Sequence, residues 1–166
     1  MTQKTKESII FDASLDVGPS DVGSTGHILD DVGFNDAMIT FPGRLYIFVE
    51  PSREYMVFPG DVAGYMSQLK RVLDEIDDGG GAVLERSYTR DRFASIEIGG
   101  NGDDIILQEI SGGGTRCIVV NLKRFKTSYY LFASVLKKRM IQCRPALGHS
   151  KFFLDLWGKR KRRRLE

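Results

Sequence analysis

Two amphipathic helical segments, each following a short apolar strand with almost no loop, constrain this chain more than any other feature. In residues 62–76, apolar side chains recur at spacings of three and four, which predicts a helix with one buried face. That stripe consists of Val62, Tyr65, Met66, Leu69, Val72, Leu73 and Ile76. Asp61 precedes it and is a candidate N-cap, because its carboxylate can accept from an orphan backbone N–H.

A second helical stripe recurs later in the chain. It consists of Phe125, Tyr129, Phe132, Leu136 and Met140. Lys137, Lys138 and Arg139 are expected in its last turn, where the helix dipole favours cations. Strand patterns precede both helices, and the sequence GGNG at Gly99–Gly102 indicates a hairpin. The predicted strands are residues 44–50 and 55–58 before the first helix, and 82–89, 90–100, 105–110 and 116–122 before the second.

The chain therefore repeats one order, strands and then a helix. This order predicts an α+β fold with two antiparallel strand-strand-helix (ββββα-like) units, which form an intramolecular pseudo-dimer around one core. The two units are residues 34–78 and 82–142, and together they make the body. Residues 1–33 are expected to be an acidic, largely flexible arm, apart from a short strand at Ser8–Phe11 that docks on the body. Residues 143–166 hold an aromatic segment and a basic tail.

Charge is distributed unevenly along the chain. Residues 1–36 hold seven acidic and two basic residues, whereas residues 137–166 hold eleven basic and two acidic residues. The whole chain has a formal net charge of +2. This asymmetry indicates a basic end that attracts anions, and an acidic arm that folds over the basic surface as an electrostatic competitor.

The repeated plan resembles the superfamily that contains Pur-alpha, the plant Whirly proteins and the nuclear positive-cofactor coactivators. The resemblance covers residues 34–142 and is strongest in SIEIGGNGDDIILQEISGGGTRCIVVNLKRFKTSYYLFASVL. It implies curved four-stranded antiparallel sheets, each followed by a helix, with two units paired through their helices. It also implies binding of single-stranded DNA or RNA across the sheets. The likeness is one of pattern, so no binding residue is carried over by identity.

Basic and aromatic residues alternate on several predicted strands, which suits a single strand of nucleic acid. Basic groups follow the phosphates, and aromatic rings stack on bases. Residues 44–50 form a strand with an aliphatic and an aromatic-basic face. The alternative is that Tyr46 and Phe48 belong to the core. The candidate residues are Arg44, Tyr46, Phe48, Arg86, Tyr88, Arg90, Arg92, Arg116 and Lys123, with Arg124 and Lys126 extending a basic rim.

The C-terminal residues offer two further candidate sites. Lys159, Arg160, Lys161, Arg162, Arg163 and Arg164 form a continuous basic run. Such a run predicts salt-dependent binding to phosphates or a nuclear localisation signal, and the two roles are compatible. The segment SKFFLDLWG predicts a short helix that either packs on the body or anchors a partner protein. Its candidate partner-binding residues are Phe152, Phe153, Leu156 and Trp157.

The chain is thus predicted to be a non-enzymatic, intracellular and nuclear protein that binds single-stranded nucleic acid and forms a homo-oligomer. The alternative is a viral or nuclear interaction or assembly module, in which the tail serves localisation and the aromatic segment serves docking. His27 and His149 lie far apart, and no P-loop, Rossmann or G-x-S-x-G motif occurs, so neither catalysis nor a cofactor or metal is expected. Cys117 and Cys143 are expected to be buried, reduced thiols. No apolar run approaches the roughly 20 residues that span a bilayer, and no signal peptide is expected.

Overall fold

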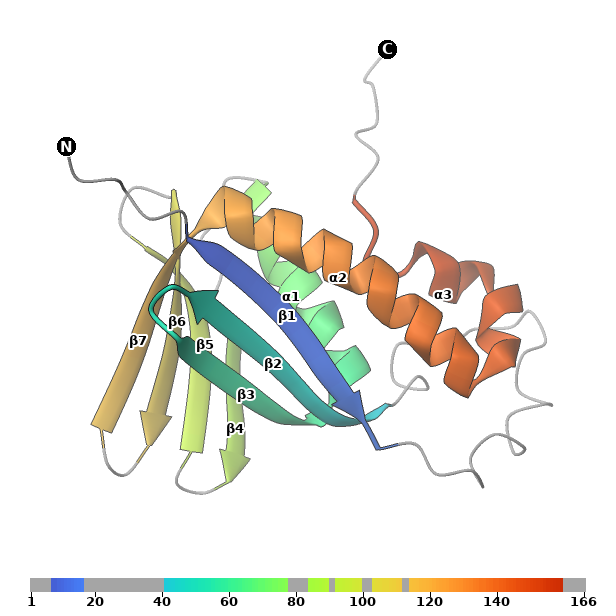
Figure 1. Cartoon of the computed structure of the whole chain (residues 1–166), viewed down its shortest axis with the longest axis horizontal. Helices are drawn as coiled ribbons and strands as arrows, with labels where there is room; N and C mark the ends of the chain where they lie inside the picture. Colours follow the sequence, from blue (N-terminus) through green and yellow to red (C-terminus); the bar gives the residue numbers. More distant parts are fainter. Residues whose placement is uncertain are drawn as a thin grey trace, which may run out of the picture.

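The computed structural model describes residues 7–16, 41–77, 84–89, 92–99, 103–111 and 114–159, and it has two antiparallel sheets with a layer of helices (Figure 1). For residues 84–89, 92–99 and 109–111, only the backbone is described. The first sheet has the order β1 (Ser8–Leu15), β2 (Pro42–Glu50), β3 (Glu54–Asp61). The second has the order β4 (Leu84–Thr89), β5 (Arg92–Gly99), β6 (Asp104–Ser111), β7 (Gly114–Asn121). The helices are α1 (Val62–Asp77), α2 (Leu122–Cys143), the 3-10 helix η3 (Pro145–His149) and α3 (Lys151–Asp155).

The α+β class and the order of strands before each long helix are confirmed. β2 has the two faces that its alternation predicts, because successive side chains of a strand point to opposite sides. Leu45, Ile47 and Val49 are buried against the helices, whereas Arg44 and Phe48 are exposed on the other side. β5 and β6 pair antiparallel on the two sides of the predicted hairpin, whose residues 100–102 lie outside the described residues.

β1 is a full member of the first sheet and pairs with the whole of β2, from Ser8 opposite Glu50 to Leu15 opposite Gly43. The predicted docking strand at Ser8–Phe11 is confirmed and extends four residues further. Phe11 is buried and its ring lies 5.2 Å from that of Phe125 in α2. Residues 8–15 are therefore part of the core, and a deletion of residues 1–33 would remove a strand together with the arm.

Asp61 begins α1 as its sequence predicts. One carboxylate oxygen accepts from the backbone N–H of Gly64 at 3.1 Å, and the other accepts from the N–H of Phe41 at 2.9 Å. The side chain thus satisfies an orphan donor of the helix and fixes the chain where β2 begins. The apolar stripe of α1 is buried against β2 and β3, apart from the half-buried Ile76 near its end.

α2 packs along β1, and its predicted stripe of Phe125, Tyr129, Phe132, Leu136 and Met140 is buried. The helix ends at Cys143, four residues after Arg139, so the basic triplet at 137–139 does not occupy its last turn. Instead, Arg139 reaches β1, donating to the carbonyl oxygen of Ala13 at 2.6 Å. Both long helices also contact the second sheet, since α1 touches β4 and α2 touches β6 and β7.

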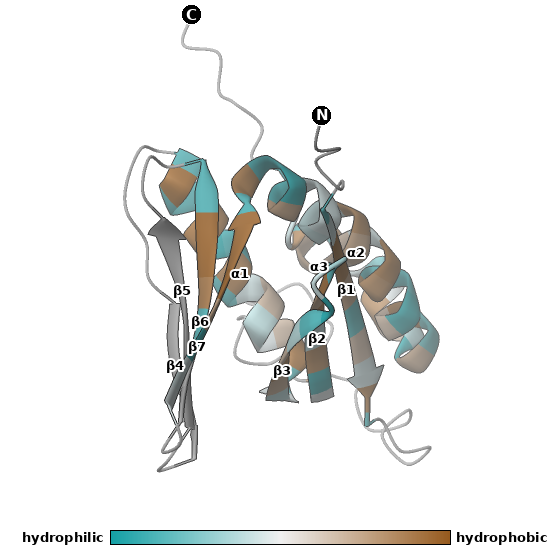
Figure 2. Ribbon diagram, turned by 60° about the vertical axis from the view of Figure 1, so that its left-hand side comes forward, coloured by the Kyte–Doolittle hydropathy of each residue, from teal (hydrophilic) through white to brown (hydrophobic). Residues whose placement is uncertain are grey.

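The second sheet contributes Ile105, Leu107, Ile118 and Val120 to the same core. It stands beside the helices in Figure 2, where parts of β6 and β7 are coloured as hydrophobic. The first four residues of β7, from Gly114 to Cys117, are exposed, whereas Ile118 and Val120 further along the strand are buried. This part of β7 thus extends past the helices.

The C-terminal segment folds back on the helices. Phe153 and Trp157 are buried, with ring centroids 6.2 Å apart, and the indole N–H of Trp157 donates to Ser67 Oγ in α1 at 2.9 Å. Trp157 follows α3 in the left-handed region, with φ of 62°. None of the helices in the described part of the chain combines the length and hydropathy that crossing a bilayer requires.

Candidate nucleic-acid interface

The outer face of the first sheet, opposite the helices, carries a row of large apolar side chains across its three strands. The register places Ile10 opposite Phe48, and Phe48 opposite Tyr55. These side chains are 45%, 36% and 49% exposed, respectively. Folding has already buried the other face of the sheet, so the exposed row contributes little to the core and is available to a ligand.

Three of the rings on this face lie close together and are called here the aromatic row: Tyr46, Phe48 and Tyr55. The rings of Tyr46 and Phe48 are stacked, with centroids 6.0 Å apart and planes 13° apart. The rings of Phe48 and Tyr55 are also 6.0 Å apart, with planes 34° apart. Tyr46 is half-buried and Phe48 is exposed, so the alternative that both belong to the core is wrong.

Tyr55 and Ile10 were not among the candidate residues from sequence. Alternation in the strand at 55–58 already sets Tyr55 apart from the buried Met56 and Phe58. What local pattern could not supply is the register that brings Tyr55 opposite Phe48 and Ile10 onto the same row. The sequence therefore indicated that Tyr55 lies on the exposed face, but not which side chains of the other strands lie beside it.

Arginines flank the aromatic row on two sides. Arg44 is exposed two residues before Tyr46 on β2, opposite Ser14 and Pro59. Arg116, from the second sheet, donates from Nη2 to the backbone carbonyl of Tyr55. Its guanidinium carbon also lies 5.5 Å from the centroid of the Tyr55 ring, within cation–π distance. Both arginines were predicted; the structure brings Arg116 to the Tyr55 ring, and Arg44 lies on the same face of β2 as Tyr46.

Acidic groups lie on the same face and moderate its charge. Asp12 stands opposite Tyr46, and Glu50 is exposed at the end of β2. Asp12 Oδ1 is paired with Arg139 Nη1 at 3.3 Å, which offsets its charge. The face is therefore of mixed charge, with its aromatic centre lying between cations rather than within a basic field.

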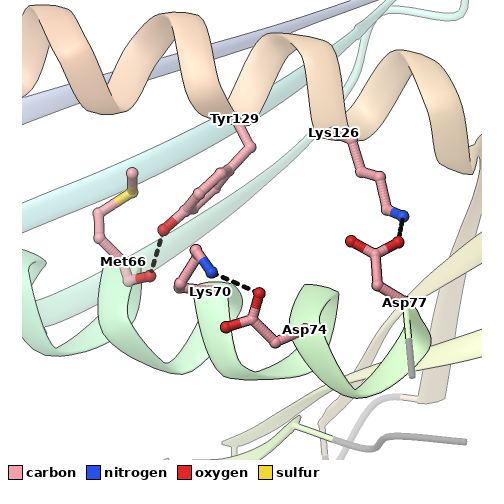
Figure 3. Close-up of polar contacts among 6 residues, drawn as sticks. All are labelled: Met66, Lys70, Asp74, Asp77, Lys126 and Tyr129. Carbon is pink, nitrogen blue, oxygen red and sulfur yellow. Dashed lines mark hydrogen bonds and ion pairs between the residues drawn. The ribbon is translucent and has the colours of Figure 1, made fainter. Parts of the chain in front are cut away.

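The rim predicted at Lys123, Arg124 and Lys126 lies at the start of α2. Arg124 Nη1 donates to the carbonyl of Glu7 at 2.7 Å, beside a cavity of about 420 Å³ that Lys123 also lines. Lys126 forms an ion pair with Asp77 at the end of α1, so its charge is used between the two helices (Figure 3). Lys123 and Arg124 are exposed, whereas Lys126 is half-buried.

The four candidates between 86 and 92 do not share one continuous strand. Arg86 and Tyr88 lie on β4, and Arg92 begins β5. The register shifts between Ser87 and Thr89, so simple alternation along this stretch does not hold. Arg90 lies outside the described residues, as do the positions of the other three side chains.

The basic tail begins on the helix side of the molecule. Lys159 Nζ lies 5.4 Å from the centroid of the Tyr130 ring on α2. The helices cover the inner face of the first sheet, so Lys159 and the aromatic row lie on opposite sides of that sheet. Arg160, Lys161, Arg162, Arg163 and Arg164 lie outside the described residues.

The candidate partner-binding residues divide into two groups. Phe153 and Trp157 are buried in the chain's own core, which agrees with the alternative that this segment packs on the body. Phe152 is 40% exposed, and Leu156 is half-buried. Both line a cavity of about 440 Å³ between α1 and α3, together with Lys70, Lys151, Asp155, Trp157 and Gly158.

Among the described residues, no three His, Cys, Asp or Glu side chains gather so that they could hold a metal ion. Both cysteines are free. Cys143 is half-buried, but Cys117 is exposed, so the expectation that both thiols are buried is wrong. Cys117 lies in the part of β7 that extends past the helices, where neither face of the strand is covered.

Comparisons with known proteins give no counterpart for this chain: no family model matches it, and no curated protein or solved structure matches it either. The resemblance to the Pur-alpha and Whirly superfamily remains a prediction.

Proposed function

We propose that this chain is a non-enzymatic protein that binds single-stranded DNA or RNA on the outer face of its first sheet. The observation that carries the proposal is the aromatic row. Its ring centroids are 6.0 Å apart from Tyr46 to Phe48, and again 6.0 Å apart from Phe48 to Tyr55. Arg44 and Arg116 flank it. Exposed aromatic rings stack on unpaired bases, and cations beside them bind the phosphates.

The physical argument favours a single strand over a duplex. In a duplex, the base faces are stacked inside the helix, so an aromatic ring reaches them only when the strand is unpaired. Stacking is worth about 1–3 kcal/mol per base, which corresponds to about fivefold to more than a hundredfold in Kd for each ring removed. With acidic groups on the same face, stacking rather than charge supplies most of the selectivity.

The tail has a separate role in this proposal. Lys159–Arg164 raises affinity for any polyanion, single-stranded or double-stranded, through release of counterions. The same run suits a nuclear localisation signal. The repeat of strands before a helix also favours two related units within one chain, arranged as a pseudo-dimer around the helices.

Fluorescence anisotropy with labelled single-stranded DNA, single-stranded RNA and duplex DNA, at two salt concentrations, tests the proposal. The full chain is compared with a chain that ends at Gly158. The shortened chain should still prefer single strands, because the aromatic row is unchanged. Equal affinity for single strand and duplex, or loss of all binding with the tail, contradicts the proposal.

Substitution of one ring identifies the surface. Phe48→Leu keeps an apolar side chain but removes the ring, and it should weaken single-strand binding by about tenfold. Val119→Ala is the matched control, since Val119 is a 55% exposed apolar residue of the second sheet, away from the row. It should leave the affinity unchanged.

A second candidate is a protein-interaction surface, favoured by one observation. Ile10 continues the aromatic row across β1 and is 45% exposed, yet an aliphatic side chain offers no stacking surface for a base. A protein partner would bury Ile10 and Phe48 alike, so both would contribute to its binding. Ile10→Ala therefore separates the candidates, because it should weaken a protein partner strongly and a nucleic acid only slightly.

A further inference from the structure

We propose that Arg116 joins the two sheets into one binding surface, so that a bound single strand crosses from β3 to β7. This inference rests on the proposed function and adds the path of the strand. Arg116 is the residue that positions the strand at the crossing, and positions on the second sheet extend the site beyond the aromatic row.

The first step is the contact itself. Arg116 lies on β7, in the second sheet, yet it donates to the carbonyl of Tyr55 and places its guanidinium over the Tyr55 ring. β3 and β7 belong to different sheets, so this side chain bridges a boundary that no ladder hydrogen bond crosses. The bridge ends at the last ring of the aromatic row.

The second step is exposure on the far side of the bridge. Every described residue of β7 up to Cys117 is exposed, whereas Ile118 and Val120 are buried. The helices therefore leave this end of β7 uncovered. A single strand of nucleic acid that passes Tyr55 therefore reaches an exposed part of the second sheet.

The third step is the register of the second sheet. Arg116 pairs with Glu109, Glu109 with Ala94, and Ala94 with Arg86, which makes one cross-strand row. Arg92 lies two residues further along β5 than Ala94, opposite Ser111, which in turn pairs with Gly114. Two of the arginines that the sequence singled out thus lie at the same end of the sheet as Arg116, at its uncovered end.

The cross-strand row from Arg116 to Arg86 is long enough to contact more than one nucleotide of a bound single strand. Three strand spacings separate β7 from β4, which amounts to about 14 Å between the positions of Arg116 and Arg86. The basic tail does not offer an equivalent extension, because Lys159 lies on the helix side of the first sheet. The second sheet is the direction in which the surface continues.

The test is a length series. Anisotropy is measured with labelled oligothymidylates from about 4 to about 16 nucleotides, the range of site sizes seen for single-strand binders. The proteins are the wild-type chain and its Arg116→Ala, Arg86→Ala and Arg71→Ala variants. Arg71 is the matched control, since it too is an exposed arginine but lies on α1, where it pairs with Glu75.

The wild-type chain should gain affinity as the oligonucleotide lengthens. Arg116→Ala should remove most of that gain, costing about tenfold for the longest oligonucleotide and little for the shortest, and lowering the salt slope by about one. Arg86→Ala should weaken only the longer oligonucleotides, and this variant keeps the test valid if Arg116→Ala folds poorly. Arg71→Ala should follow the wild type at every length.

Two outcomes overturn the inference while the proposed function stands. One is an Arg116→Ala variant that weakens all lengths equally, which confines the arginine to the aromatic row. The other is a chain that loses affinity with Phe48→Leu but not with Arg116→Ala or Arg86→Ala. If the wild-type chain binds no single strand at any length, the proposed function fails and the inference fails with it.

Discussion

The hydroxyl of Tyr129 in α2 donates a hydrogen bond of 2.7 Å to the backbone carbonyl of Met66 in α1 (Figure 3). Tyr129 is fully buried, and its ring also packs against Phe11 of β1. One side chain thus connects the two long helices to the N-terminal strand. Because the site is buried, the bond fixes the relative position of the helices that both sheets share.

Tyr129→Phe should lower the free energy of unfolding by about 1–2 kcal/mol, because the Met66 carbonyl stays buried without its donor. Urea denaturation measures the loss. Tyr130→Phe is the matched control, since the Tyr130 hydroxyl has no hydrogen-bond partner among the described residues. An equal loss in both variants would show that the bond between the helices is not the cause.

Stability should also fall at alkaline pH. Burial raises the pKa of Tyr129 above its usual value of 10.0, because the phenolate cannot be solvated in the core. The unfolded chain then loses its proton first, so the contribution is complete below pH 10 and is lost as pH rises above it. Denaturation midpoints measured from pH 8 upward should therefore decline less in Tyr129→Phe than in the wild type. Parallel curves would contradict this assignment.

Phe11→Ala should destabilise the chain by about 3–5 kcal/mol, because it leaves a cavity between β1 and α2. Ile10→Ala, one residue earlier on the exposed face, should cost under about 1 kcal/mol. Thermal melts of the two variants compare the faces of one strand directly. Similar melting temperatures for both would mean that β1 is not held in the core.

The C-terminal segment can be followed through the one tryptophan of the chain. Trp157 is buried, so its emission should be blue-shifted in the native protein. Phe153→Ala should shift it to the red, because Phe153 packs against the indole ring. Leu154→Ala should leave it unchanged, since Leu154 is 48% exposed and is not among the residues that line the cavity beside Trp157. Red emission from the wild-type chain would contradict the docked segment.

The sequence determined the local elements of this protein. Alternation fixed which residues of β2 face the helices, and spacing of three and four fixed the buried stripes of both helices. Asp61 was recognisable as a cap because its role depends only on the next three residues. These features follow from the geometry of a strand or a helix, which a short stretch of sequence encodes in full.

The tertiary structure alone decided which elements meet. In the folded chain, β1 pairs with β2, and Tyr55 lies opposite Phe48. Arg116, from the other sheet, contacts Tyr55. The tertiary structure also turned Phe153 and Trp157 into the core, where the sequence left docking on a partner open. An amphipathic pattern predicts that the apolar face of an element is buried, but it does not indicate which other element covers that face. The partner is chosen by packing among segments distant in sequence, because only the folded chain brings their surfaces together.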